Sequence, residues 1–349
     1  MEPICGNFNI EFIEDLSKDV YCLQEKENTF CVFYSVNEIL YLVYSTIDLS
    51  IIFYDIINKV KIVEIKKAHE SYIIEFRHYL DDIEKKKKRD LVLSSSYEDR
   101  NIKIWDVNNM ECIFNINPYS KGIIYSSCFL YDNYSNEILI ATSNYNNNSN
   151  DLEPIKVFHL QGEELKEIND SNYSTIFIDS FYDEEYNNIF IITANKYSVI
   201  SYDYNENAEY HKYMQGNFLY DCTSIIIYNK NRNIDDKIKI IYSTGNGFIR
   251  VWDFHRGEFL YEIKVSEGYI FSICLLDDKY LFSCGKYYKN EITKKEDKQS
   301  DIKMIHINGE VTCKIIEHSI FGKFLVTKNI ADDGPIKLWK IRTYIIFFM

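Results

Sequence analysis

The residues that most often carry chemistry are scattered along this chain. The nine cysteines are odd in number and never spaced Cys-x-x-Cys, which favours buried thiols of a reducing compartment over zinc ligands or disulfides. The histidines lie one to a region, without the close spacing of metal ligands. They are His69, His78, His159, His211, His255, His306 and His318. We therefore expect no metal site and no cofactor.

The short motifs of catalysis and phosphate binding are missing from the sequence. It contains no GxGxxG, GxxxxGK[ST], GxSxG or HExxH pattern and no EF-hand loop. Carboxylates or histidines from separate segments could still converge in the fold, so a catalytic site is the minority interpretation. We expect a protein that is not an enzyme and that takes no small-molecule substrate.

The charge of the chain argues against nucleic acid as a partner. The formal net charge is −14 at pH 7, which would repel a phosphate backbone unless the basic residues gathered on one face. The basic run Lys85–Lys88 is bracketed by acidic residues and lacks interleaved aromatics, which indicates a solvated loop. An acidic protein favours a basic segment of another protein as its partner.

Targeting signals are not apparent. The start MEPICGNFNIEFIED lacks the basic residues and apolar run of a secretion signal. No stretch approaches the roughly 18 uninterrupted apolar residues of a membrane span. We expect no membrane association and a cytoplasmic or nuclear location.

The elements that would position any site repeat along the chain. Three stretches end alike, NIKIWDV (Asn101–Val107), FIRVWDF (Phe248–Phe254) and PIKLWKI (Pro335–Ile341), and each reads as an alternating strand closing on Trp. Fainter copies of this strand occur elsewhere, and the residue at the Trp position of each copy is here called its marker. The markers are Tyr54, Trp105, Phe158, Tyr202, Trp252, Ile305 and Trp339. Seven units follow, of roughly 45 to 50 residues except for a short last interval.

Each unit contains several short β-rich runs separated by polar turns. In the second unit these runs are residues 72–79, 90–96, 101–106 and 111–116. Their spacing predicts four-stranded antiparallel sheets, and no segment shows a sustained helical period. The sequence thus predicts an all-β repeat fold.

On these residues the chain resembles the WD40-repeat β-propeller family. The stretch SSSYEDRNIKIWD (Ser94–Asp106) follows that family's pattern, with Asp99 six residues before Trp105. The resemblance implies a propeller of seven blades, each a four-stranded antiparallel sheet. It also implies a structural network of His69, Ser95, Asp99 and Trp105, in which a hydroxyl and a carboxylate satisfy a buried imidazole and indole.

The resemblance implies one domain over residues 1–349. Residues 1–28 would supply a strand that closes the ring, residues 29–343 the blades, and residues 344–349 an apolar tail that competes for the same edge. Phe8–Ile13 and Asp19–Gln24 are the candidate closing strands. The short interval before Trp339 predicts that the seventh blade lacks an inner strand.

The family pattern also implies where a partner would dock. Aligning the starts of the inner strands brings Ile73, Ile124 and Ile270 into register as core residues. The residues beside them would border the channel mouth, where large aromatic side chains make good protein contacts. The protein-binding candidates are Tyr72, Ile74, Glu98, Tyr125, Tyr269 and Phe271.

The function that this resemblance implies is a non-catalytic scaffold for protein–protein interactions in a complex. One alternative is a substrate-recognition subunit of a ubiquitin ligase, although Trp252–Arg256 misses the Trp-Asp-x-Arg motif of some such propellers. A propeller enzyme with a site at the channel mouth is the other. A fold by itself does not specify a function.

Overall fold

In the computed structural model, every regular element of the described residues is a β-strand. Those residues are 7–17, 30–81, 88–120, 122–145, 153–168, 175–195, 198–214, 222–228, 238–265, 270–276, 280–285, 293–295, 303–308, 311–318, 322–329 and 336–344, and side chains are described only between Phe30 and Ser283. The prediction of an all-β protein is confirmed.

Five sheets are each built from four consecutive antiparallel strands. The first contains β2 (Phe30–Tyr34), β3 (Leu40–Ser45), β4 (Ile51–Asp55) and β5 (Val60–Ile65). The second contains β6 (Ile73–Asp81), β7 (Arg89–Ser96), β8 (Ile102–Asp106) and β9 (Glu111–Ile116). The third contains β10 (Ile123–Asp132), β11 (Glu137–Tyr145), β12 (Ile155–His159) and β13 (Glu164–Ile168).

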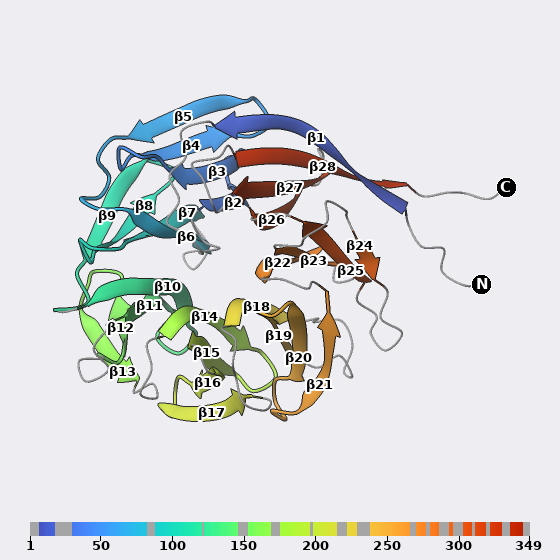
Figure 1. The fold of residues 1–349 in the computed structure, drawn as a ribbon. Coiled ribbons are helices and arrows are strands. Elements are labelled where there is room, and N and C mark those ends of the chain that lie inside the picture. The colour runs from blue at the N-terminus through green and yellow to red at the C-terminus, as the bar shows by residue number, and fades with distance from the viewer. Residues whose placement is uncertain are drawn as a thin grey trace.

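The fourth sheet contains β14 (Thr175–Asp183), β15 (Asn188–Asn195), β16 (Val199–Asp203) and β17 (Ala208–Tyr213). The fifth contains β18 (Cys222–Tyr228), β19 (Lys239–Thr244), β20 (Phe248–Asp253) and β21 (Phe259–Lys264). The sheets lie around a common centre, which gives the molecule a β-propeller-like form (Figure 1).

The repeated marker residues share one structural position. In the first five sheets each marker lies on the third strand, where the pairing with the fourth strand shifts by one residue. In four of these sheets the next residue is an aspartate whose Oδ1 accepts a backbone N–H of the following turn at 2.9 Å. The Trp-Asp pattern therefore marks a β-bulge followed by a turn whose backbone N–H is bonded by the aspartate.

The sixth sheet departs from the regular order. Its strands run β22 (Ile270–Leu276), β23 (Tyr280–Gly285), β25 (Lys303–Asn308) and β24 (Thr293–Lys295), and β23 pairs with β25 in parallel. β24 precedes β25 in the chain but occupies the edge that a fourth strand takes elsewhere. The segment between β23 and β25 thus contains an edge strand.

The seventh sheet joins the two ends of the chain. It contains β26 (Val311–His318), β27 (Gly322–Asn329) and β28 (Ile336–Tyr344), and β1 (Asn7–Ser17) pairs antiparallel with β28. The prediction that this unit lacks an inner strand was wrong, because β26 occupies that position. Among the described residues, the position left empty in the regular order is that of a fourth strand of the sixth sheet directly after β25 in the chain. Phe8–Ile13 lies in β1, whereas Asp19–Gln24 and residues 345–349 lie outside the described residues.

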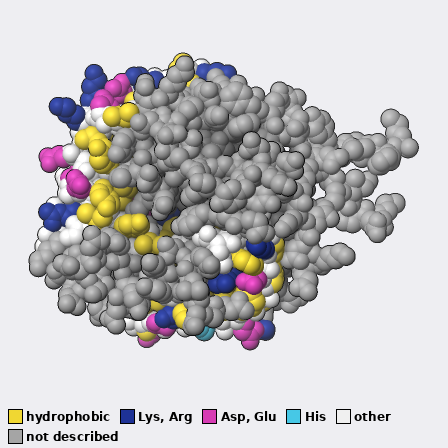
Figure 2. Space-filling view, in the orientation of Figure 1, with side chains coloured by type: hydrophobic (Ala, Val, Ile, Leu, Met, Phe, Trp, Pro, Cys, Tyr) yellow, Lys and Arg dark blue, Asp and Glu magenta, His cyan; other side chains and the backbone are white. Residues whose placement is uncertain are grey.

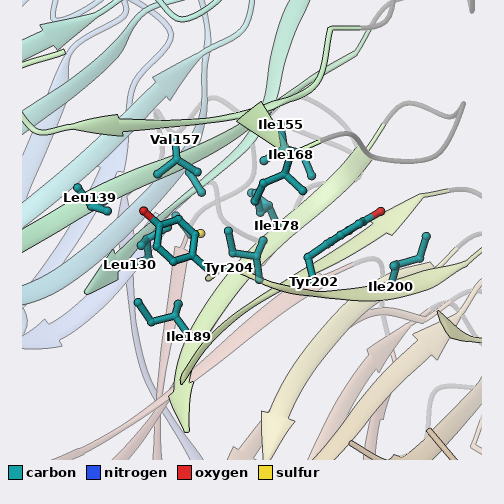
Figure 3. Packing of buried hydrophobic residues seen from close by; sticks show 13 residues of the cluster. Leu130, Leu139, Ile155, Val157, Ile168, Ile178, Ile189, Ile200, Tyr202 and Tyr204 are labelled. Carbon is teal, nitrogen blue, oxygen red and sulfur yellow. The ribbon is translucent and has the colours of Figure 1, made fainter. Parts of the chain in front are cut away.

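The hydrophobic core lies between neighbouring sheets. One cluster combines Leu130, Leu139 and Val157 of the third sheet with Ile178 and Ile189 of the fourth (Figure 3). Similar clusters join the first sheet to the second, the second to the third, the fourth to the fifth and the fifth to the sixth. Each sheet is therefore stabilised by its neighbours, as in other repeat proteins.

Candidate docking site

Four side chains of the second sheet and its adjoining turns form one hydrogen-bonded group. Nε2 of His69 lies 2.8 Å from Oγ of Ser94, and Nε1 of Trp105 donates to the same Oγ at 2.8 Å. Nδ1 of His69 lies 3.2 Å from Oδ2 of Asp99, which also accepts the backbone N–H of Glu70 at 2.9 Å. The polar atoms of this group are used to brace strands and turns against one another.

The serine of this network is Ser94 and not Ser95, so that prediction was wrong by one residue. Successive residues of a strand point to opposite faces of the sheet, and the neighbouring hydroxyl therefore faces away from Trp105. Ser95 instead donates to Oγ of Ser127 in β10 at 3.0 Å. One serine holds the network within its sheet, and the other joins the second sheet to the third.

The network makes stability depend on pH. Burial lowers the pKa of His69 despite its hydrogen bond to Asp99. Burial would raise the pKa of Asp99, but the bonds from His69 and the Glu70 N–H hold it below its ordinary value. Both groups thus have lower pKa values folded than unfolded, and the unfolded chain binds more protons as the pH falls.

We expect the free energy of unfolding to decrease as the pH falls below about 6.5, where His69 protonates in the unfolded chain, and again below about 4 for Asp99. Denaturant titrations from pH 8 to pH 3 measure this. His69→Gln should lose the decrease attributable to the imidazole while keeping other pH effects. An identical pH dependence in the variant would contradict the assignment to His69.

The predicted docking residues that the structure describes lie on one side of the molecule, defined here as the upper face, where the first strands β6, β10 and β22 begin. Ile74, Tyr125 and Phe271 are equivalent, each being the extra residue of a bulge in those strands. Ile74 is only 1% exposed, so its assignment as a docking residue was wrong. Its side chain packs in the interior, unlike that of Tyr125 at the same bulge position.

The other predicted docking residues differ in accessibility. Tyr72 is 37% exposed, Glu98 is exposed and Tyr125 is half-buried. Tyr269 and the side chain of Phe271 lie outside the described part of the chain. The upper face therefore offers Tyr72, Glu98 and Tyr125 to a partner.

In the third and fifth sheets the residue after the first-strand bulge joins consecutive first strands. Oγ of Ser126 in β10 accepts the N–H of Ile178 in β14 at 3.2 Å, and Oγ of Ser224 in β18 accepts the N–H of Ile273 in β22 at 3.1 Å. In β6 the same position is Glu75. Where the third and fifth sheets use a serine hydroxyl, the second sheet places a buried carboxylate.

Glu75 forms a buried ion pair that spans three sheets. Its carboxylate accepts the N–H of Ser127 in β10, and Arg77 Nε donates to its Oε1 at 3.0 Å. The Arg77 guanidinium also donates to the Ile178 carbonyl in β14 at 3.1 Å and lies 3.6 Å from Oδ2 of Asp179. Burial opposes its charge, but Glu75 and Asp179 raise the pKa of Arg77, so it stays protonated.

A cavity of about 430 Å³ opens beside this ion pair on the lower face, which is the side where β6, β10 and β14 end. Its volume lies within the range of small ligand sites. Its polar members include Arg77, His78, Asp179 and Ser180. Its aromatic wall comes from Tyr79, Phe129, Tyr131, Phe181 and Tyr182.

Several polar groups of the cavity are already engaged. Nε2 of His78 lies 2.7 Å from Oδ1 of the buried Asp90, and the imidazole stacks on Phe33 with ring centroids 3.9 Å apart. Oγ of Ser180 donates to the Phe129 carbonyl at 2.7 Å. Burial raises the pKa of the Cys128 thiol, which makes it a poor nucleophile. The cavity is better suited to binding than to reaction.

A second cluster lies between the fourth and fifth sheets. Nε2 of His255 lies 2.9 Å from Oδ2 of Asp183, and Nδ1 lies 3.4 Å from the Tyr210 hydroxyl. Tyr186 stacks on the imidazole with ring centroids 4.3 Å apart. Burial raises the pKa of Tyr210, which disfavours the phenolate that a nucleophile would need. We interpret this cluster as an inter-sheet contact.

Sequence reasoning directed attention to the upper face and missed the cavity. A signal was present in the register of the first strands, because Glu75 aligns with Ser126, Ser224 and Ser272. A carboxylate among serines, with an arginine two residues later on the same side of the strand, marks an unusual position. Its partner Asp179 comes from a distant unit and had no local signal.

Figure 2 shows acidic and basic side chains interspersed along the rim of the described surface, with hydrophobic side chains gathered toward β9 and β10. Among the described residues no group of three or more His, Cys, Asp and Glu side chains is placed to share a metal ion. The same residues include no helix with the length and apolar character needed to cross a membrane.

Comparison with known proteins shows the class of fold. No protein-family model matches the chain, and no curated protein matches it significantly. The chain is similar to the crystal structure of the computationally designed Ika8 protein, with a TM-score of 0.57 and 14% identity, covering 93% of this chain and 100% of that one. Such a likeness shows the fold alone, an all-β architecture of propeller-like sheets.

Proposed function

We propose that this chain is a closed, seven-bladed propeller of the WD40 type that acts as a non-catalytic docking platform for a protein partner in the cytoplasm or nucleus. The pairing of β1 with β28 supports a closed ring, since it joins the ends of the chain in one sheet. The His69, Ser94, Asp99 and Trp105 network supports a scaffold role, because these side chains bond to one another.

The lower-face cavity is the observation that carries the docking function. Tyr79, Phe129 and Tyr131 give it an aromatic wall, and such side chains bury a large area at low entropic cost. The cavity lies against the ion pair of Glu75 and Arg77, which ties three sheets together and keeps the wall rigid. A rigid aromatic pocket suits an anchor residue of a partner.

Photo-crosslinking tests this function and the face that serves it. A photoreactive phenylalanine analogue replaces Tyr131 at the cavity or, as the matched control, the exposed Tyr72 on the upper face. In cells, the tagged chain should co-purify with a protein in near-stoichiometric amount, and that protein should cross-link from position 131. Absence of an associated protein would contradict the docking function. Cross-links from position 72 alone would contradict the lower-face site.

A further inference from the structure

We infer that the lower-face cavity receives a long cationic side chain, an arginine or lysine in a basic segment of the partner. This inference rests on the proposed docking function and adds the chemistry that the site recognises. It is carried by the unequal accessibility of the charges in the cavity and by the aromatic wall around them.

The accessible charge in the cavity is negative. The Asp179 side chain is 35% exposed, whereas that of Arg77 is 17% exposed. Arg77 already donates to Glu75 and to the Ile178 carbonyl. One cation against the two carboxylates Glu75 and Asp179 leaves one net negative charge. Oδ1 of Asp179 accepts the Ser180 N–H at 2.9 Å, and the exposed carboxylate keeps further lone pairs for a cationic ligand, whereas an anion would meet a net negative charge.

The wall of the cavity suits the body of such a side chain. The rings of Tyr79 and Phe129 lie 5.5 Å apart and tilted by 42°, and further aromatic rings come from β10 and β14. A guanidinium or ammonium group is attracted to the faces of such rings. Leu130 and Ile189 supply apolar wall for the methylene stem. The site therefore combines a carboxylate with an aromatic and apolar lining.

The whole molecule adds to this selectivity. The net charge of −14 draws basic segments toward the surface and speeds their encounter. Any acidic residue of the protein would contribute to a general attraction of this kind for basic segments. A test must therefore separate the contribution of Asp179 from that of the overall charge.

The test measures binding of short labelled peptides by fluorescence anisotropy at low salt. One peptide carries two arginines among glycine and serine residues. Matched peptides carry lysine, uncharged citrulline or glutamate instead. We expect the arginine and lysine peptides to bind at least about tenfold more tightly than the citrulline peptide, because citrulline keeps the shape but loses the charge. Equal binding of citrulline, or preference for glutamate, would overturn the inference.

Two single-charge variants locate the site. Asp179→Asn should weaken the arginine peptide by about tenfold, whereas Glu209→Gln, which removes one exposed carboxylate from the outer strand β17, should leave the affinity unchanged. Equal weakening by both variants would assign the binding to general charge and overturn the inference. If Asp179→Asn fails to fold, Tyr131→Leu, which removes an aromatic ring from the cavity and no charge, takes its place and should also weaken the arginine peptide. Partner cross-linking from position 131 with no peptide selectivity would leave docking intact and reject the cationic ligand.

Discussion

Replacing Glu75 by alanine should lower the free energy of unfolding by about 3 to 5 kcal/mol. The Glu75 side chain is buried, and its carboxylate accepts from Arg77, Ser126 and the Ser127 backbone. Its removal leaves the Arg77 guanidinium in the interior with only Asp179 as a nearby carboxylate, at 3.6 Å. Urea unfolding followed by tryptophan fluorescence measures the change.

A double variant separates the ion pair from simple loss of packing. Serine occupies the equivalent position of β10, β18 and β22, so Glu75→Ser combined with Arg77→Leu restores the arrangement of those strands. We expect this pair to be more stable than Glu75→Ala alone, because it removes the unpaired charge. A double variant less stable than the single one would show that Arg77 contributes mainly through its contact with β14.

Replacing Ser94 by alanine should cost about 2 to 4 kcal/mol of unfolding free energy. The Ser94 hydroxyl is the shared partner of Nε2 of His69 and Nε1 of Trp105, both at 2.8 Å. Without it two buried ring nitrogens lose their hydrogen bonds while the surrounding backbone stays in place. The stability is measured by denaturant titration at pH 7.5, where His69 is neutral in both states.

Ser95→Ala is the matched control, since Ser95 is also fully buried and directly adjacent. Its hydroxyl serves one partner, Ser127, whose own Oγ keeps a bond of 3.1 Å to Oγ1 of Thr142. We expect a cost of about 1 kcal/mol. A larger effect from Ser95→Ala than from Ser94→Ala would contradict the assignment of Ser94 to the network.

Local pattern determined most of the fold. Alternation of apolar and polar residues identified the strands, and the marker positions fell on the third strand of each unit because a bulge and a turn there require particular residue types. The same approach failed where order along the chain and order in the sheet differ. β24 reaches the outer edge of the sixth sheet by doubling back, and no local periodicity encodes that choice.

The site shows the same division. The likeness of residues 94–106 to the WD40 pattern implied that His69, Asp99 and Trp105 lie together, and the structure brings them together within one unit. Parity along the strand decided between Ser94 and Ser95, which depends on register, and the burial of Ile74 depends on the packing around its strand.

By itself, then, the sequence determined a repeated all-β architecture and most of its strand positions, since these depend on residues close together in the chain. Only the tertiary structure placed Arg77 of the second sheet against Ile178 and Asp179 of the fourth and formed an aromatic cavity from three strands. The physical reason is that burial and charge pairing across sheets depend on how separate units pack, which no single unit specifies.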